Sequence, residues 1–362
     1  MKDNELYVYY GDEPGKMVKK ILERIRIEEE IRPSDLIGIK PNLVLASRAE
    51  EGATTDPELV AGIIEYLQGK GYSNIVVLEG SWIGDRTSRA FEVCGYNELA
   101  RKYGVKLIDL QRDAAVSLEV NGEELNVCRE ALAVDYLINV PVLKGHCQTR
   151  ITCALKNLKG CIPDSEKRRF HTMGLHRPIA YLNKVLRQDL VIVDGIYGDL
   201  DFEEGGNPVQ MNRIIVGKDP VLVDSYVAEL LGYEIDDIPY IRIAAELGIG
   251  SADLRQAVIK ELNQPQGGGV IKKSAKVEWL TSNVVEDQAC SACFGNLVHA
   301  LKRLDEEGEL GRLKEKLYIG QGFKGKEFQG IGIGSCTKGA SKIIGGCPRV
   351  ATRILKELKA LI

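Results

Sequence analysis

Tyr-Leu-Ile-Asn-Val-Pro-Val-Leu-Lys-Gly-His, residues 136–146, decides the fold class of this chain. Its first five residues form a short apolar run of the length of a buried strand, and the stretch ends in a lysine and a histidine. Comparable runs recur along the first two-thirds of the sequence. We predict strands at 5–10, 36–39, 75–78, 105–110, 136–140, 190–193 and 213–216.

Segments with helical spacing separate these runs, at 14–30, 57–70, 87–103, 178–186, 220–231 and 239–247. Several begin with proline, which is favoured in a first helical turn because no amide donor is needed there. Strands separated by helices of this length predict an α/β fold, with a mainly parallel sheet covered by helices on both faces. Residues 116–120 and 124–127, around Asn121-Gly122, predict an inserted hairpin.

A linker is predicted at residues 263–269, Asn-Gln-Pro-Gln-Gly-Gly-Gly, because proline stops a helix and a glycine triplet is flexible. The chain then divides into an α/β domain over residues 1–265 and a smaller α+β domain over 271–362. In the smaller domain we expect strands at 277–280, 317–319 and 330–333, and helices at 290–304 and 349–361.

Composition restricts the functional class. The 362 residues are 44% hydrophobic and carry a net charge of −4, so neither nucleic acid nor an anionic membrane is an expected partner. The sequence shows no export signal and no apolar stretch of about 18 residues. Nine cysteines, an odd number, then favour reduced thiols that bind a metal. We expect a cytoplasmic protein.

Charged or hydrogen-bonding residues follow four predicted strands: Lys40-Pro41-Asn42, Glu79-Gly80-Ser81, Lys144-Gly145-His146 and Asp194-Gly195. Ligands of parallel sheets bind beyond the carboxyl ends of the strands, and a partly buried lysine needs an anionic partner. These positions predict a site for a carboxylate or phosphate. The candidate binding residues are Lys40, Asn42, Lys156, Asn157 and Asp194, and the candidate catalytic residues are His146, His171 and Lys144.

Structural roles are the alternative for each of these residues, as turn formers, caps or satisfied core groups. Lys156 and Lys159 are three residues apart, so they could share a helix face directed at an anion or form a solvated basic face.

Cys290-Ser-Ala-Cys293, Cys336 and Cys347 form the candidate metal site. Four thiolates are a complete ligand set for an iron–sulfur cluster, and the surrounding glycines let backbone N–H groups approach sulfur. We expect a [4Fe–4S] cluster, with [2Fe–2S] or zinc as alternatives; the ten-residue spacing of the second pair is unlike a zinc ribbon. The other cysteines fit small buried hydrophobes, although metal ligation by Cys147, Cys153 and Cys161 stays open.

Several motifs together resemble the DUF362 family, and they span roughly residues 36–248. They are Ile39-Lys40-Pro41-Asn42-Leu43, Thr54-Thr55-Asp56-Pro57, the segment 139–146, Ala154-Leu155-Lys156-Asn157-Leu158-Lys159-Gly160, Val193-Asp194-Gly195 and the segment 217–224. The family is of unknown function and its members are often described as iron–sulfur proteins, so the resemblance implies a cluster. The general plan is also similar to that of lactate racemase-like proteins.

The sequence therefore predicts an iron–sulfur redox protein with a single cluster, which transfers electrons to a partner protein or to an anionic ligand of the α/β domain. Such a protein could be an oxidoreductase, although the sequence does not decide whether it is an enzyme. The alternative is a lysine- and histidine-based enzyme that acts on a small carboxylate or phosphate compound, with a purely structural cluster or zinc. The oligomeric state stays open, with a homodimer as one option.

Overall fold

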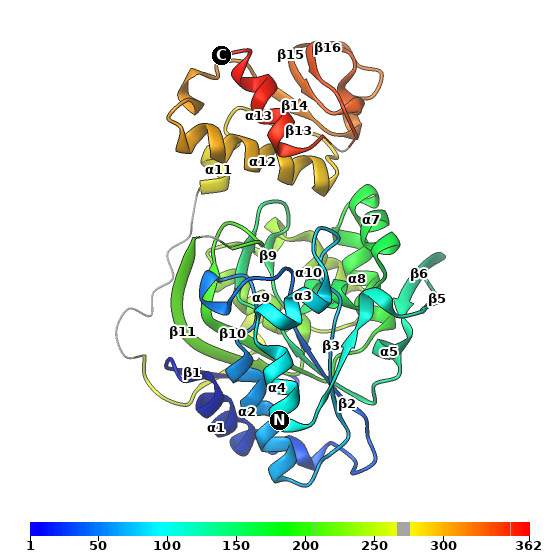
Figure 1. The fold of residues 1–362 in the computed structure, drawn as a ribbon, viewed down its shortest axis with the longest axis vertical. Coiled ribbons are helices and arrows are strands. Elements are labelled where there is room, and N and C mark those ends of the chain that lie inside the picture. Colours follow the sequence, from blue (N-terminus) through cyan, green and yellow to red (C-terminus); the bar gives the residue numbers. More distant parts are fainter. Residues whose placement is uncertain (206, 266–275, 348) are drawn as a thin grey trace. The chain divides into compact units, whose positions relative to one another are not determined.

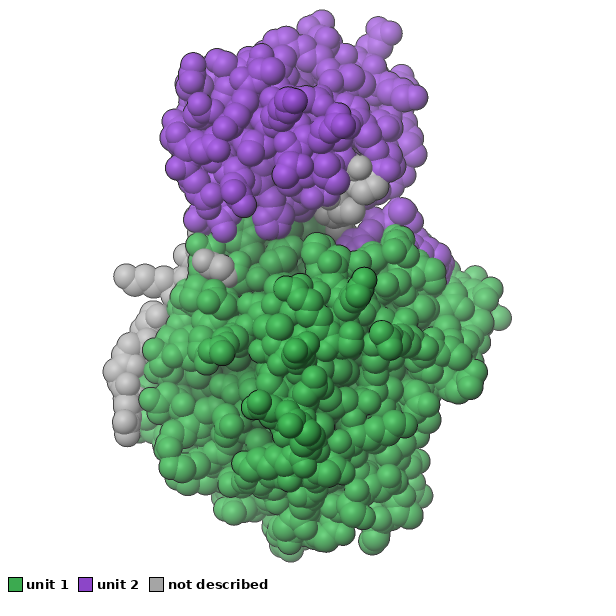
Figure 2. All heavy atoms as spheres, in the orientation of Figure 1, with its two compact units in different colours: residues 1–168, 176–273 green, residues 169–175, 274–362 purple. Residues whose placement is uncertain are grey.

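The computed structural model describes residues 1–205, 207–265, 276–347 and 349–362. Two compact units are distinguished, one of residues 1–168 and 176–273 and the other of residues 169–175 and 274–362 (Figure 2). The predicted linker at 263–269 falls largely on residues 266–275, which lie outside the described residues.

The described part of the first unit contains an eight-stranded sheet with the order β12-β1-β11-β10-β7-β2-β3-β4 (Figure 1). The sheet is parallel except at β11, which runs antiparallel to β10 and β1. The predicted α/β class is confirmed. The strands are β1 (Glu5–Tyr10), β2 (Ile37–Pro41), β3 (Ile75–Glu79), β4 (Lys106–Asp109), β7 (Tyr136–Val140), β10 (Leu190–Asp199), β11 (Pro208–Gly217) and β12 (Val258–Glu261).

One face of this sheet packs on helices from the first third of the chain. Alternate strand residues such as Ile39, Val77 and Ile138 are fully or almost fully buried in one core with these helices. The helices are α1 (Pro14–Ile25), α2 (Pro57–Gly69), α3 (Thr87–Val93) and α4 (Tyr96–Tyr103). The predicted single helix over 87–103 is wrong, because Gly95 adopts a φ of 81° and separates α3 from α4.

Helices from the middle of the chain pack on one another, and α6 and α9 contact the central strands. They are α6 (Ala154–Asn157), α8 (His176–Val185), α9 (Pro220–Leu230) and α10 (Pro239–Glu246). The Asp219 side chain caps α9 by accepting the N–H groups of Val221 and Leu222. The predicted hairpin is present as β5 (Ala115–Val120) and β6 (Glu123–Cys128).

Beyond the carboxyl end of β7, the short hairpin of β8 (Lys144–His146) and β9 (Arg150–Thr152) leads into α6, a 3₁₀ turn over Leu158–Cys161 and α7 (Asp164–Met173). Strand β10 extends past the predicted end at residue 193 and packs closely on this hairpin. A Cβ on Gly198 would lie 2.0 Å from the Leu143 carbonyl oxygen, and one on Gly145 would lie 2.1 Å from that of Leu200. Both glycines therefore permit the approach that brings the loop after β10 to β8.

The second unit contains a parallel sheet with the order β13-β14-β15-β16 in its described residues. Its elements are α11 (Lys276–Leu280), β13 (Val284–Glu286), α12 (Ser291–Glu306), β14 (Leu317–Ile319), β15 (Phe328–Ile333), β16 (Ala340–Ile344) and α13 (Ala351–Lys359). The predicted strand at 277–280 is wrong: this segment is helical, and the Thr281 hydroxyl donates to the Val277 carbonyl one turn back. Within the described ranges, no helix is long and apolar enough to span a membrane.

Candidate functional site

Lys40 and Glu79 form a buried ion pair at the ends of the neighbouring strands β2 and β3. Lys40 Nζ lies 2.8 Å from Glu79 Oε1, and the two side chains are 0% and 3% exposed. Glu79 also accepts the backbone N–H groups of Leu43 and Gly80, at 2.7 Å each. Gly160 lies against the pair, since a Cβ there would meet Glu79 Oε1 at 2.2 Å. This pair joins two strand ends to the turn after α6.

Lys144 is fully buried, and all three of its N–H donors have acceptors. Lys144 Nζ donates to Asn42 Oδ1 at 3.0 Å, to the Ala53 carbonyl at 2.6 Å and to the Glu203 carbonyl at 3.0 Å. Burial lowers its pKa to about 8. In this arrangement Lys144 holds the segments around residues 53 and 203, so its geometry fits a positioning residue.

Glu203, in the loop between β10 and β11, is the central carboxylate of the site. Its Oε1 lies 2.5 Å from Lys156 Nζ, and its Oε2 lies 3.1 Å from His146 Nε2. Burial alone would raise the pKa of Glu203, but Lys156, His146 and Lys144 hold it well below its usual value. Glu203 is therefore a carboxylate anion at neutral pH.

The hydrogen bonds of His146 define its tautomer. Its Nδ1 accepts the backbone N–H groups of Gln148 and Thr149, at 3.0 Å each. Because Nδ1 is an acceptor, the neutral ring carries its proton on Nε2 and donates to Glu203. Burial, assisted by the charge of Lys156, lowers the pKa of His146 and keeps the ring neutral. His146 thus orients Glu203.

Lys159 differs from the other lysines of this region. Lys40, Lys144, Lys156 and Lys167 each donate to at least two protein acceptors. For the half-buried Lys159, the described residues provide no hydrogen-bond or ion-pair partner. Burial, together with the charges of Lys156 and Lys167 and against that of Glu203, lowers the pKa of Lys159 to about 7. In its protonated form Lys159 is thus an ammonium group whose N–H donors have no acceptor among the described residues.

A chain of buried side-chain amides connects Lys144 to the helical layer. Each member donates to the oxygen of the next, so all donors point away from the ammonium group. The order is Lys144, Asn42, Asn157, Asn139, Gln188 and Asn183, with donor–acceptor distances of 3.0, 2.8, 2.7, 2.5 and 2.7 Å. The final amide donates to the carbonyls of Leu155 and Ile179. Aligned hydrogen bonds polarise one another, so the chain stabilises the positive charge at its start.

Most of the sequence-derived candidates meet at this edge of the sheet: Lys40, Asn42, Lys144, His146, Lys156 and Asn157. Asp194 is 1% exposed and accepts the N–H groups of Asp56 and Ile196, at 2.8 and 3.1 Å, which fits a structural role. Its pKa is raised to about 7 by burial. The half-buried His171 lies on α7, in the segment 169–175 that groups with the second unit.

The sequence interpretation did not assign Glu203 and His176 to the site, and it assigned Lys159 only a shared helix face. His176 stacks on Tyr240 with ring centroids 6.0 Å apart, and burial, followed by the charge of His146, lowers its pKa to about 4. Glu203 follows a strand, which is the same signal that identified Lys144. It was missed because β10 extends six residues beyond its apolar run, from Val193 to Asp199.

The four candidate cluster cysteines all belong to the second unit, on three segments: the start of α12, the 3₁₀ turn Ser335–Thr337 and the loop after β16. Burial raises the pKa of Cys290 and of Cys293, and the thiols of Cys336 and Cys347 raise both further. Gln321 Nε2 donates to Cys290 Sγ at 3.4 Å, and the Arg349 backbone N–H donates to the Cys293 sulfur.

This donor set fits an iron–sulfur cluster in its chemistry, because it offers four thiols and N–H groups directed at two of the sulfurs. Among the residues described, no group of three or more His, Cys, Asp or Glu side chains is arranged to hold a metal ion.

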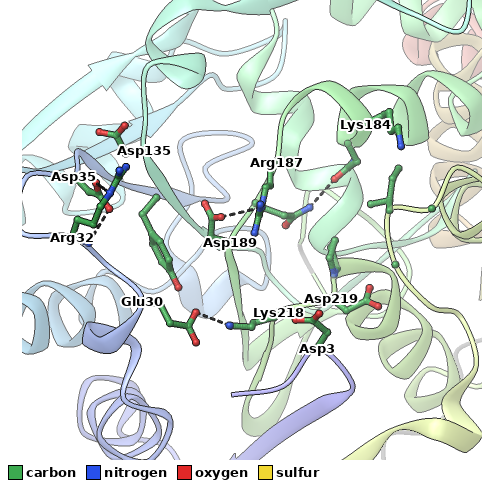
Figure 3. A pocket seen from close by; sticks show the side chains of 17 residues that line it. Asp3, Glu30, Arg32, Asp35, Asp135, Lys184, Arg187, Asp189, Lys218 and Asp219 are labelled. Atoms are coloured by element: carbon green, nitrogen blue, oxygen red, sulfur yellow. Dashed lines mark hydrogen bonds and ion pairs between the residues drawn. The ribbon is translucent and has the colours of Figure 1, made fainter.

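A separate polar cavity of about 600 Å³ lies at the opposite edge of the large sheet (Figure 3). Its lining includes Tyr136, the first residue of β7, and Asp189, which precedes β10. Lys218 and Glu30 form an ion pair of 2.6 Å in its wall. The cavity is therefore distinct from the site around Lys144, Lys156 and Glu203, which lies where the parallel strands end.

Comparison with known proteins identifies a family, and the matches include one curated protein and one solved structure of low similarity. The family model described as "Domain of unknown function (DUF362)" matches residues 37–229. The thylakoid-associated protein sll1697 of Synechocystis sp. is 26% identical over 233 residues, which are 60% of this chain and 70% of that protein. The lactate racemase apoprotein of Thermoanaerobacterium thermosaccharolyticum has a TM-score of 0.40 and 14% identity. That match covers 62% of this chain and only 56% of the solved chain.

Proposed function

This chain belongs to the DUF362 family, as its motifs predicted. We propose that its α/β unit contains an enzyme site that binds a small carboxylate or phosphate compound through Lys159. The main support for this proposal is that the Lys159 amine has no protein acceptor among the described residues and can therefore bind a ligand. In the part of the chain that the structure describes, Lys40, Lys144, Lys156 and Lys167 donate to protein acceptors and Lys159 does not, which favours Lys159 as the cation that pairs with an anionic ligand.

The same amine can also transfer a proton. A group is the most effective general acid or base when its pKa lies near the working pH. The pKa of Lys159, at about 7, meets this condition, whereas the strongly held Glu203 carboxylate does not. Lys156, Lys144 and His146 then position Glu203 and the surrounding loops.

Replacing Lys159 by methionine is expected to abolish the binding of succinate and inorganic phosphate, measured by titration calorimetry. Only the protonated amine pairs with an anion, so wild-type affinity for succinate should fall about tenfold per pH unit above pH ~7 and level off below it. The control Lys106→Met removes an exposed lysine of β4 and should bind as the wild type does. Undiminished binding by Lys159→Met would contradict the proposed site.

We further propose that the second unit holds one iron–sulfur cluster, with [4Fe–4S] as the expected form, in a reducing compartment such as the cytoplasm. The thiols of Cys336 and Cys347 contribute to the raised pKa values of Cys290 and Cys293, so the four side chains lie near one another, which supports this second role. Cys290, Cys293, Cys336 and Cys347 would be the ligands, and the bound group would supply one-electron transfer to a partner protein or an anionic ligand.

Anaerobically purified protein is expected to contain about four irons per chain and to give a paramagnetic signal on reduction. Cys293→Ser should lose most of the iron, because a cage with three thiolates binds it less firmly. Cys94→Ser is the matched control, since Cys94 is buried in the first unit and should leave iron content unchanged. Stoichiometric zinc with no iron would refute the redox assignment.

A further inference from the structure

The polar cavity of about 600 Å³ at the opposite edge of the large sheet has the size of a ligand pocket, since such pockets measure roughly 300–1,000 Å³ (Figure 3). All of its lining residues belong to the first unit, and Lys159 is not among them. We infer that this cavity is a second ligand site, which binds a small organic cation with amine groups.

The charges in the wall of this cavity favour a cation. The described residues that line it include six carboxylates and four cationic side chains. Each cationic group already has an acceptor: Arg32 pairs with Asp35 at 2.9 Å, Arg187 with Asp189 at 3.1 Å and Lys218 with Glu30 at 2.6 Å, and Lys184 donates to the Leu247 carbonyl at 2.9 Å. Asp3, Asp135 and Asp219 have no cationic partner within the described ranges. The negative charge that remains attracts cations and repels anions.

Two of these uncompensated carboxylates lie near each other. Asp219 is 9% exposed and accepts the backbone N–H groups of Val221, Leu222 and Ser251. Burial raises the pKa of Asp219, its backbone hydrogen bonds oppose this rise, and the charge of Asp3 supports it. Asp3 is exposed, and its side chain has no hydrogen-bond or ion-pair partner among the residues described. A ligand ammonium group beside Asp3 would relieve the repulsion between the two carboxylates, whereas an anion would add to it.

Tyr136 contributes an unsatisfied hydroxyl group to the wall of the cavity. The residue is 5% exposed, and its hydroxyl oxygen has no hydrogen-bond partner in the part of the chain that is described. A buried hydroxyl without a partner costs free energy, so this group points to a ligand. Burial, together with the charges of Glu30 and Asp189 and against that of Arg187, raises the pKa of Tyr136, so the phenol stays neutral. Its oxygen, near two carboxylates, suits an ammonium group, which has only donors.

Buried amides hold another part of the wall in place. Asn183 and Gln188, each 6% exposed, line the cavity and form the end of the amide chain that starts at Lys144. The Gln188 side chain accepts from Asn139 at 2.5 Å and donates to Asn183 at 2.7 Å. Because these side chains are already ordered, a ligand does not have to order them, which lowers the entropic cost of binding.

Calorimetric titration of the full chain with spermidine, a small polyamine, tests the inference at low ionic strength. We expect saturable binding. Tyr136→Phe should weaken it about tenfold, because one hydrogen bond to a charged group is lost. This variant should unfold in urea at the same midpoint as the wild type or a higher one, since the deleted hydroxyl has no partner in the described structure.

Asp3→Asn tests the charge of the cavity, and Asp12→Asn is its matched control, because Asp12 is also exposed but does not line the cavity. Asp3→Asn should weaken spermidine binding about threefold or more, the size of an exposed charge interaction, whereas Asp12→Asn and Lys159→Met should bind as the wild type does. No saturable binding, or equal binding by the wild type, Tyr136→Phe and Asp3→Asn, would overturn the inference. Inorganic phosphate binding that is weakened by Tyr136→Phe but not by Lys159→Met would reveal an anion site in the cavity and would also overturn it.

Discussion

Replacing Glu79 by alanine is expected to destabilise the α/β unit by about 3–5 kcal/mol, because it leaves an uncompensated buried charge. Lys40 is 0% exposed and has Glu79 and the Pro41 carbonyl as acceptors, so the variant removes its only carboxylate contact among the residues described. The backbone N–H groups of Leu43 and Gly80 lose an acceptor as well. Urea unfolding followed by circular dichroism should show a midpoint lowered by about 1 M or more.

A double variant distinguishes the cost of leaving the Lys40 charge unpaired from the cost of removing the acceptor of the two backbone N–H groups. Lys40→Met with Glu79→Leu removes both charges at similar volume and should recover a large part of the lost stability, since buried ion pairs are often replaceable by apolar pairs. Glu79→Gln keeps the side-chain oxygen and should be intermediate. If the double variant is as unstable as Glu79→Ala, the loss comes from the two backbone N–H groups rather than from Lys40.

The location of the site was predictable because it depends on local sequence and on a general rule. Short apolar runs gave the strands, and Lys40 and Lys144 follow two of them. Parallel strands bring their carboxyl ends to one edge, so these residues had to lie close together. The first residues of α2 and α9, Pro57 and Pro220, were predictable for a similar reason, since a proline after an aspartate is typical of a first helical turn.

The roles of the lysines were not predictable, because they depend on which acceptors each amine meets in the folded chain. Lys144 was predicted to be catalytic, but its three donors are engaged by residues 42, 53 and 203, which are far apart in sequence. Lys159 looks like an ordinary basic residue in the sequence. Its distinction arises only because the neighbouring lysines have acceptors and, among the described residues, Lys159 has none.

Asn139 is a polar residue within the apolar run of β7, and this position in the sequence already indicated a buried hydrogen-bond network. An asparagine in the middle of a buried strand must find hydrogen bonds, because an unsatisfied buried amide is costly. Asn139 is 0% exposed, donates to the Ala154 carbonyl and Gln188 Oε1, and accepts from Asn157. These partners lie on α6 and in the loop before β10, both distant from β7 in sequence, so the network could be seen only in the folded chain.

Asn139→Leu is therefore expected to destabilise the α/β unit by about 2–4 kcal/mol, although leucine is similar in size and suits a buried strand. Gln188 Oε1 loses its donor and Asn157 Nδ2 loses its best acceptor. A double-mutant cycle with Gln188→Leu, measured by urea unfolding, should give a coupling energy of about 1 kcal/mol or more, since the two amides contact each other.

The double-mutant cycle shows whether the hydrogen-bonded amides stabilise the unit together or as independent contacts. If the amides act together, the double variant loses less stability than the sum of the single variants, because the first substitution has already removed the bond between them. Ile192→Val provides the control: Ile192 is fully buried in the other face of the sheet, so its effect should add to that of Asn139→Leu. Strict additivity of Asn139→Leu and Gln188→Leu would show that the aligned amides do not support one another, and Lys144 would then depend only on its three direct acceptors.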